Sequence, residues 1–255
     1  MTRLFLALSL LLCPLGASAA DIVVIGEVHD NPVHHENQAR IVAGVAPVAL
    51  VFEMLTPEQA GQVTPSSRGD EHALEAALGW NASGWPDFTH YYPIFAAAPE
   101  AAIFGAAVPR AQAREAMEQG PATVFGADAA RFGLTEALPE AEQSAREALQ
   151  MSAHCDALPE TMLPAMVDIQ RLRDVALARA ALVAHEATGG PVVVITGNGH
   201  ARRDWGMPAV LARVAPALTL RVIGQTEDGA PLSGGFDEIL SAPTPERPDP
   251  CAAFR

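Results

Sequence analysis

Short apolar runs alternate with longer amphipathic segments along the chain. The first run, residues 21–25, is rich in β-branched side chains and ends at Gly26, which is typical of a buried strand. A second run, residues 47–52, ends at Glu53, and the residues between them, 32–45, are enough for a crossover helix. The pattern predicts a βαβ unit at the start of the folded chain.

The same alternation continues toward the C-terminus. Further strands are expected at residues 101–108, 191–196 and 218–223, and helices at residues 110–119, 139–153, 161–187 and 202–214. The Ala-, Glu- and Arg-rich helices in the middle of the chain are expected to cover the sheet or to form a cap. The predicted fold class is α/β, with a mainly parallel central sheet flanked by helices and a helical cap inserted in the middle of the chain.

Residues 1–19 have the pattern of a secretory signal peptide. Arg3 gives the positive end, residues 4–15 the apolar core and residues 17–19 a small-residue cleavage site. The apolar core is too short to span a membrane. We therefore expect a periplasmic protein that begins at Ala20; a lipid anchor at Cys13 is the less favoured alternative.

After the signal peptide we expect one α/β domain, residues 20–240, and a Pro-rich tail, residues 241–255. Cys155 and Cys251 remain after cleavage, in a compartment that permits disulfides. Their spacing matches no zinc site. They form either one disulfide or two separate thiols.

The amino-acid composition argues against one class of partner, nucleic acids. The chain has 255 residues, 49% of them hydrophobic, and a net charge of −14 from 16 basic and 30 acidic residues. All the basic residues are arginines, and no cluster is larger than the pair Arg202-Arg203. Nucleic-acid binding needs a basic face, so a nucleic-acid partner is not expected.

Two strand ends carry the same motif, G-x-x-H. It occurs as Gly26 to His29, where Glu27 is the second residue, and as Gly197 to His200, where Asn198 is the second residue. Glu53 follows another strand. Ligands of open parallel sheets gather at the carboxyl ends of the strands, so we expect these side chains to share one crevice. Imidazoles and carboxylates together suit a divalent metal or acid/base chemistry.

The helix after the first motif is expected to begin at Asn31-Pro32, and at most one of His34 and His35 is expected to face the site.

These motifs, with Phe52-Glu53-Met54 and the segment 197–208, resemble the ChaN-like haem-binding lipoproteins, within the wider Tiki, TraB and erythromycin esterase superfamily. Other residues, each a weaker sign of the family by itself, occur in the same order as in its members: Trp80, Trp85, Tyr91-Tyr92-Pro93-Ile94, Val108-Pro109-Arg110, His154, Gln170 and Asp174. The chain departs from the family in its cysteine context and in Ala107, where relatives tend to carry Asn.

The resemblance implies a periplasmic haem-binding protein of iron or haem uptake, more a binding protein than an enzyme. Its implied partners are haem and an outer-membrane haem receptor or transporter, and a homodimer is a further expectation. Haem needs an axial ligand, an apolar slot and cations for its propionates. Tyr91 and Tyr92 are the expected iron ligands; the wider expected haem site adds Glu27, His29, His35, Glu53, Arg110, Asn198, His200 and Arg202.

Two alternatives stay open. One is a peptidase- or esterase-type hydrolase, in which Glu27, His29, Glu53 and His200 activate water directly or through a divalent metal bound by His29 and His200. The other is a structural or interaction protein that keeps the pocket without using it.

Overall fold

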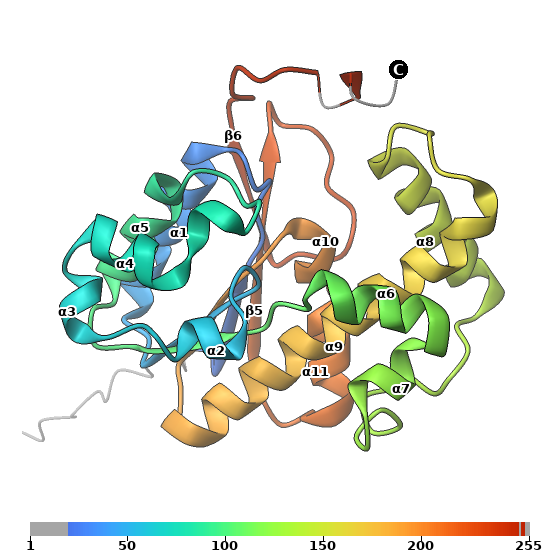
Figure 1. The fold of residues 1–255 in the computed structure, drawn as a ribbon, viewed down its shortest axis with the longest axis horizontal. Coiled ribbons are helices and arrows are strands. Elements are labelled where there is room, and N and C mark those ends of the chain that lie inside the picture. Colours follow the sequence, from blue (N-terminus) through green and yellow to red (C-terminus); the bar gives the residue numbers. More distant parts are fainter. Residues whose placement is uncertain (1–19, 250, 253–255) are drawn as a thin grey trace, which may run out of the picture.

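The computed structural model describes residues 20–249, 251 and 252, which fold around one six-stranded sheet (Figure 1). The strand order is β3-β2-β4-β1-β5-β6, and all neighbouring strands are parallel. The strands are β1 (Ile22–Ile25), β2 (Ala49–Phe52), β3 (Ala102–Gly105), β4 (Val192–Ile195), β5 (Leu220–Glu227) and β6 (Glu238–Ala242). The predicted α/β class with a parallel central sheet is confirmed.

The order of the strands decides which loops meet. β4 lies between β1 and β2, and Val193 is in register with both Val23 and Leu50. The chain therefore leaves the centre of the sheet after β1 and returns to it only at β4. As a result, the segments that follow β1, β2 and β4 emerge side by side at one edge.

Helices cover both faces of the sheet. The helices along the chain are α1 (Pro32–Val45), α2 (Pro57–Ala60), α3 (Pro65–Arg68), α4 (Glu71–Leu78), α5 (Phe88–Ala97), α6 (Arg110–Gln119), α7 (Pro121–Phe125), α8 (Glu140–Ala153), α9 (Leu163–Thr188), α10 (Asn198–Ala201) and α11 (Met207–Val214). Figure 1 shows α1, α4 and α5 grouped on one side and α6, α9 and α11 on the other. No helix of the described residues is long and apolar enough to cross a membrane.

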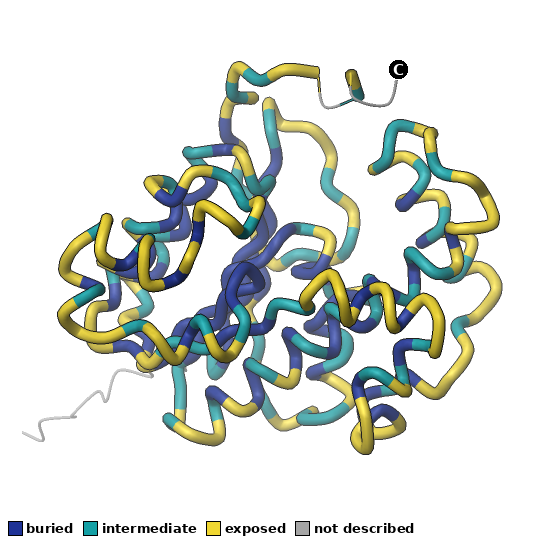
Figure 2. Tube along the Cα trace, viewed as in Figure 1, coloured by how far each residue is buried: buried dark blue, intermediate teal, exposed yellow. Residues whose placement is uncertain are grey.

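Burial on both faces explains the unbroken apolar strands. In β1, Ile22 and Val24 join the core under α9 and α11, whereas Val23 and Ile25 join the core under α1 and α5. Figure 2 shows the buried sheet enclosed by helices whose outer sides are exposed. A strand covered on both faces has no polar side, so the sequence shows no alternation.

Local signals set the start of α1 as predicted. The Asn31 side chain accepts a hydrogen bond from the backbone N–H of Val33, and Pro32 occupies the first helical position. The Asn31 side chain thus satisfies one of the unpaired N–H groups at the start of the helix, and Pro32 has no N–H group that would need a partner.

The structure also departs from several sequence-based expectations. β6 was missed, and it extends into the segment from Ser241 that we expected to be tail; Ala242 is buried in it. The helix expected over residues 202–214 begins only at Met207, because the backbone of Gly206 is extended. Cys155 and Cys251 are joined by a disulfide, which decides the alternative left open above.

Candidate functional site

The three strand-end segments meet as predicted. His29 after β1, Glu53 after β2 and His200 after β4 line one cavity of about 470 Å³. Other lining side chains come from the loop before α5, the connection between β3 and α6, and α9; they include Trp85, Arg110, Gln170 and Arg173. The histidines of both G-x-x-H motifs therefore share one pocket with Glu53, as expected, whereas Glu27 and Asn198 do not line it.

Each motif's glycine makes room for the other motif. A Cβ added at Gly26 would lie 2.4 Å from Oδ1 of Asn198, and one at Gly197 would lie 3.0 Å from Nε2 of His29. A side chain at either position would push the two strand ends apart. The repeated glycine therefore has a packing reason, namely the close approach of β1 and β4.

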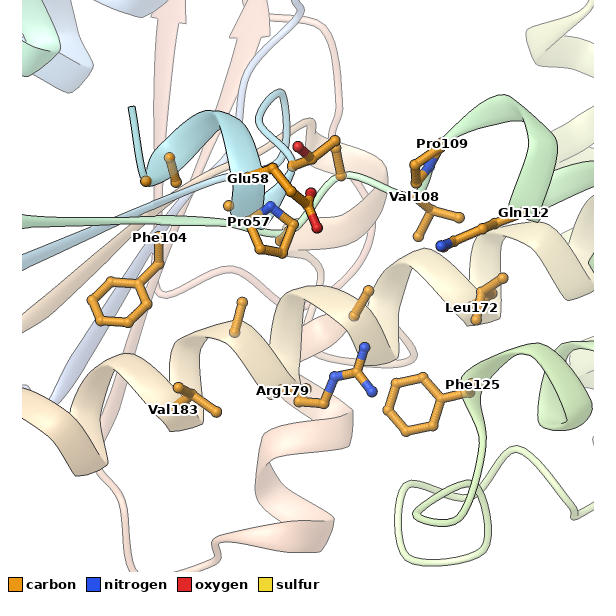
Figure 3. A pocket seen from close by; sticks show the side chains of 18 of the residues that line it. Pro57, Glu58, Phe104, Val108, Pro109, Gln112, Phe125, Leu172, Arg179 and Val183 are labelled. Carbon is orange, nitrogen blue, oxygen red and sulfur yellow. The ribbon is translucent and has the colours of Figure 1, made fainter. Parts of the chain in front are cut away.

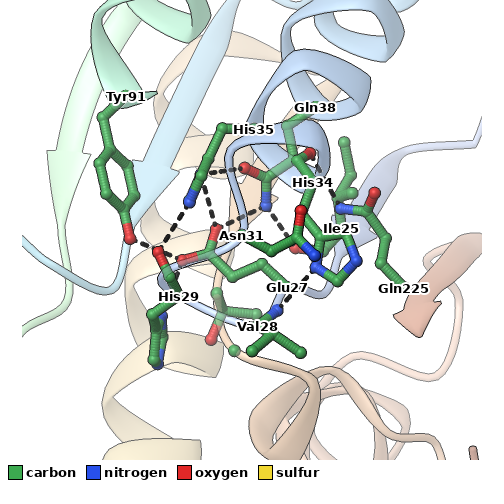
Figure 4. Close-up of polar contacts among 12 residues, drawn as sticks. Ile25, Glu27, Val28, His29, Asn31, His34, His35, Gln38, Tyr91 and Gln225 are labelled. Atoms are coloured by element: carbon green, nitrogen blue, oxygen red, sulfur yellow. Dashed lines mark hydrogen bonds and ion pairs between the residues drawn. The ribbon is translucent and has the colours of Figure 1, made fainter. Parts of the chain in front are cut away.

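His29 is held by Glu27. The Nδ1 atom of His29 lies 2.7 Å from Oε1 of Glu27, which also accepts a hydrogen bond from the Tyr91 hydroxyl at 2.8 Å (Figure 4). Gln38 donates to the other carboxylate oxygen at 2.7 Å. An ionised carboxylate only accepts, so Nδ1 of His29 must carry a proton. Within the described part of the chain, this arrangement leaves Nε2 without a hydrogen-bond partner, on a side chain that is 36% exposed.

The surrounding carboxylates also change the protonation of His29. Burial by itself lowers its pKa, but the hydrogen bond to Glu27 and the charges of Glu53, Glu27 and Asp30 outweigh burial and raise the pKa to about 9. At neutral pH the ring is therefore an imidazolium, with protons on both nitrogens.

Glu53 is a buried anion that lines the same pocket as His29. Its Oε2 atom accepts hydrogen bonds from the Thr196 hydroxyl at 2.6 Å and from the Gly197 backbone at 2.8 Å. Burial raises its pKa, but the nearby imidazoles of His200 and His29 and these two hydrogen bonds outweigh burial and lower it to about 2. Glu53 stays charged at any physiological pH.

His200 has its own carboxylate partner. Its Nδ1 atom lies 2.7 Å from Oδ1 of Asp174 on α9, and its Nε2 atom lies 3.7 Å from Oε1 of Glu53. Burial favours the neutral ring, but these two carboxylates outweigh burial and raise the pKa of His200. The site therefore contains two carboxylate–imidazole pairs, of which the Glu27–His29 pair is the more open to solvent.

The cavity walls fit a flat, anionic cofactor. The Trp85 ring lies with its centroid 4.9 Å from that of His29, at an interplanar angle of 65°. The guanidinium groups of Arg110 and Arg173 supply cations, and the buried Oε1 atom of Gln170 has no hydrogen-bond partner among the residues that the structure describes. An imidazole nitrogen, an aromatic wall and two arginines are the groups that haem requires.

The two tyrosines are not at the cavity. Tyr91 is fully buried, and both burial and the adjacent Glu27 raise the pKa of its hydroxyl far above its ordinary value. The Tyr92 hydroxyl points toward the backbone carbonyl of Arg68, 3.4 Å away. The expected placement of two tyrosines at the haem iron is therefore corrected: Tyr91 supports Glu27 from behind, and Tyr92 belongs to the packing of α5.

Four other expected site residues, His35, Asn198, Arg202 and Glu27, do not line the cavity and have structural partners instead. His35 is buried and contacts the backbone carbonyl of His29 at 2.8 Å, and His34 accepts a hydrogen bond from the Val28 backbone, so neither faces the cavity. Asn198 bonds the backbone of Gln225 on β5. Arg202 pairs with Asp204 and stacks on Trp205. Glu27 is buried and acts through His29.

Asp174 on α9 contacts His200, and Arg173 lines the cavity, but neither was expected at the site from the sequence. Asp174 appeared only as a weaker sign of the family, and Arg173 had no signal of its own. The spacing of Gln170, Arg173 and Asp174 along α9 was the one available hint, because residues three and four apart share a helix face. Nothing in the sequence showed which face of this helix meets His200.

A metal site is not formed by these groups. Among residues 20–249, 251 and 252, no group of three or more His, Cys, Asp or Glu side chains is arranged to hold a metal ion. His29 and His200 line the same cavity, but they belong to no such group.

We expect Glu27→Gln to lower the pKa of His29 from about 9. The amide keeps the volume and an acceptor oxygen but removes the negative charge, so the charge-assisted hydrogen bond that raises this pKa most is lost, while the charges of Glu53 and Asp30 remain. Titration of the His29 ring by NMR measures the effect. Glu75→Gln on α4 is the control and should leave His29 unchanged. A His29 pKa still near 9 in Glu27→Gln would assign the shift to other groups.

Comparisons with known proteins place these observations in context. Residues 16–211 match the model of a family described as haem-binding uptake, Tiki superfamily, ChaN. A search of the curated proteins finds no match.

Among solved structures, ChaN of Campylobacter jejuni, described with cofacial haem binding, is similar with a TM-score of 0.66 and 18% identity over 84% of each chain. The type III effector HopBA1 matches over 88% of each chain, with a TM-score of 0.43 and 14% identity. At these identities only the first likeness carries weight, and it concerns the fold.

Proposed function

Because the chain belongs to the ChaN family of haem-binding uptake proteins in the Tiki superfamily, we propose that it binds haem in the cavity at the carboxyl ends of β1, β2 and β4. The observation that carries this proposal is His29, whose Nδ1 atom is held by Glu27 and whose Nε2 atom has no hydrogen-bond partner among the described residues. A histidine ligand that donates its second N–H to a carboxylate is fixed in orientation and made more basic.

Haem would supply an iron atom that a ring nitrogen can bind. For the chain, the chemistry is then binding and proton release: His29 holds a proton at Nε2 at neutral pH and must lose it before this nitrogen donates to a metal. Trp85 provides the apolar wall, and Arg110 and Arg173 provide cations for the propionates.

Location and partners extend this proposal. The disulfide between Cys155 and Cys251 suits an oxidising compartment, which supports a periplasmic location. The signal peptide itself lies outside the described residues. Cofacial binding, as described for the Campylobacter jejuni protein, brings two haems face to face, and a homodimer of this chain would provide two cavities for it. An outer-membrane haem receptor or transporter is the partner proposed for delivery.

Titration with ferric haem tests the binding site. We expect a shifted Soret band in the wild type and the same band in the Tyr91→Phe, Tyr92→Phe double variant. Loss of the hydrogen bond from Tyr91 to Glu27 should weaken binding by no more than about tenfold, the effect of one hydrogen bond. A tyrosinate-type spectrum that disappears in the double variant would return the iron ligand to Tyr91 or Tyr92.

A further inference from the structure

A second cavity, of about 440 Å³, lies along α9 at the open edge of β3 (Figure 3). It shares the wall formed by residues 106–109 with the cavity described above, but neither His29 nor His200 lines it. Its volume lies in the ordinary range of small-molecule sites.

Most of its surface is apolar. Phe104 on β3, Val108 in the connecting segment, and Leu172 and Val183 on α9 line it, together with small alanines of α9. Val183 is 47% exposed although it is a large apolar residue. Water in such a space has few polar partners, so an apolar group that displaces it gains contacts.

One cation lies beside this apolar surface. The Arg179 guanidinium lies 4.2 Å from the centroid of the Phe125 ring. In the part of the chain that the structure describes, it forms no hydrogen bond or ion pair. A guanidinium without an anionic partner is suited to a carboxylate or phosphate, which it can bind through two parallel hydrogen bonds.

The charge of Glu58 determines which way round an anionic ligand would lie in this cavity. Glu58 faces the cavity from α2, and hydrogen bonds to the backbone and to Thr56 at the start of that helix lower its pKa, so it remains an anion. An anionic head group is repelled there and attracted to Arg179. The remaining lining, from Phe104 to Val183, is left for an apolar chain.

We propose that this cavity binds a monoanionic amphiphile of the fatty-acid class. Its carboxylate pairs with Arg179, and its alkyl chain lies against Phe104, Leu172 and Val183. This site is separate from the haem site proposed above and does not depend on it.

Displacement of the fluorescent fatty acid cis-parinaric acid by laurate or by dodecanol tests the proposal in the full chain. Wild-type protein should bind laurate about fivefold more tightly than dodecanol, the effect of one partly exposed ion pair. Arg179→Gln should abolish this preference and keep dodecanol binding. Val183→Trp fills the cavity from an exposed position and should weaken both ligands about tenfold.

Two controls locate the ligand. Arg114→Gln on the exposed side of α6 and His29→Ala in the other cavity should leave both affinities unchanged. The proposal is overturned if the wild type does not bind laurate, if Val183→Trp has no effect, or if laurate keeps its preference in Arg179→Gln. Weaker laurate binding in His29→Ala would place the ligand in the first cavity and would also overturn it. None of these outcomes bears on haem binding, which is measured separately by absorbance.

Discussion

His29→Ala is expected to weaken haem binding about 100-fold or more and to change the Soret band, because it removes the proposed nitrogen donor from the cavity. Isothermal or absorbance titration with ferric haem measures the loss. The fold should survive, since the His29 side chain is partly exposed and the core lies in the strands. His72→Ala is the matched control, because the His72 side chain is 94% exposed on α4, and its haem affinity should equal that of the wild type.

If His29 is the ligand, the affinity for haem should also depend on pH. A proton on Nε2 of His29 competes with iron, so haem affinity should rise as pH increases from 7 toward the His29 pKa of about 9, by up to about tenfold per unit. His29→Ala should lack this rise. Unchanged haem affinity in His29→Ala, or a wild-type affinity that does not increase over this range, would contradict ligation by His29.

Glu53→Ala should destabilise the fold by about 3–5 kcal/mol, the usual effect of removing one partner of a buried charge pair. The variant leaves the Thr196 hydroxyl and the Gly197 N–H without their acceptor and leaves the His200 charge without one of its two carboxylates. Urea unfolding of the variant and the wild type gives the difference in the free energy of unfolding. Glu118→Ala on the exposed side of α6 serves as the control and should change stability by less than about 0.5 kcal/mol.

Glu53 also determines how the free energy of unfolding changes at acidic pH. The pKa of Glu53 is about 2 in the folded chain and 4.5 for an ordinary glutamate. Its contribution to stability is complete above pH 4.5 and is lost as the pH falls toward 2. The free energy of unfolding of Glu53→Gln should therefore fall less steeply than that of the wild type as the pH is lowered from 4.5 toward 2. A Glu53→Ala protein that unfolds at the wild-type urea concentration would show that this carboxylate is not an essential partner.

Prediction from the sequence succeeded where local pattern and strand topology coincide. The apolar runs around β1, β2 and β4 gave buried strands, and the residues directly after them, among them His29, Glu53 and His200, reached one cavity. It failed where a residue's role depends on the direction of its side chain. Tyr91 and Tyr92 are adjacent, yet one is buried behind Glu27 and the other faces the Arg68 backbone.

The sequence by itself determined the α/β class, the crossover helix from Pro32 and the convergence of the two G-x-x-H motifs, because these follow from short-range apolar periodicity and from the shared direction of parallel strands. Only the tertiary structure decided that β4 lies between β1 and β2, that α9 brings Asp174 to His200, and that Cys155 reaches Cys251. These contacts join residues distant in the chain, and their geometry depends on how whole helices pack against the sheet, which no local pattern encodes.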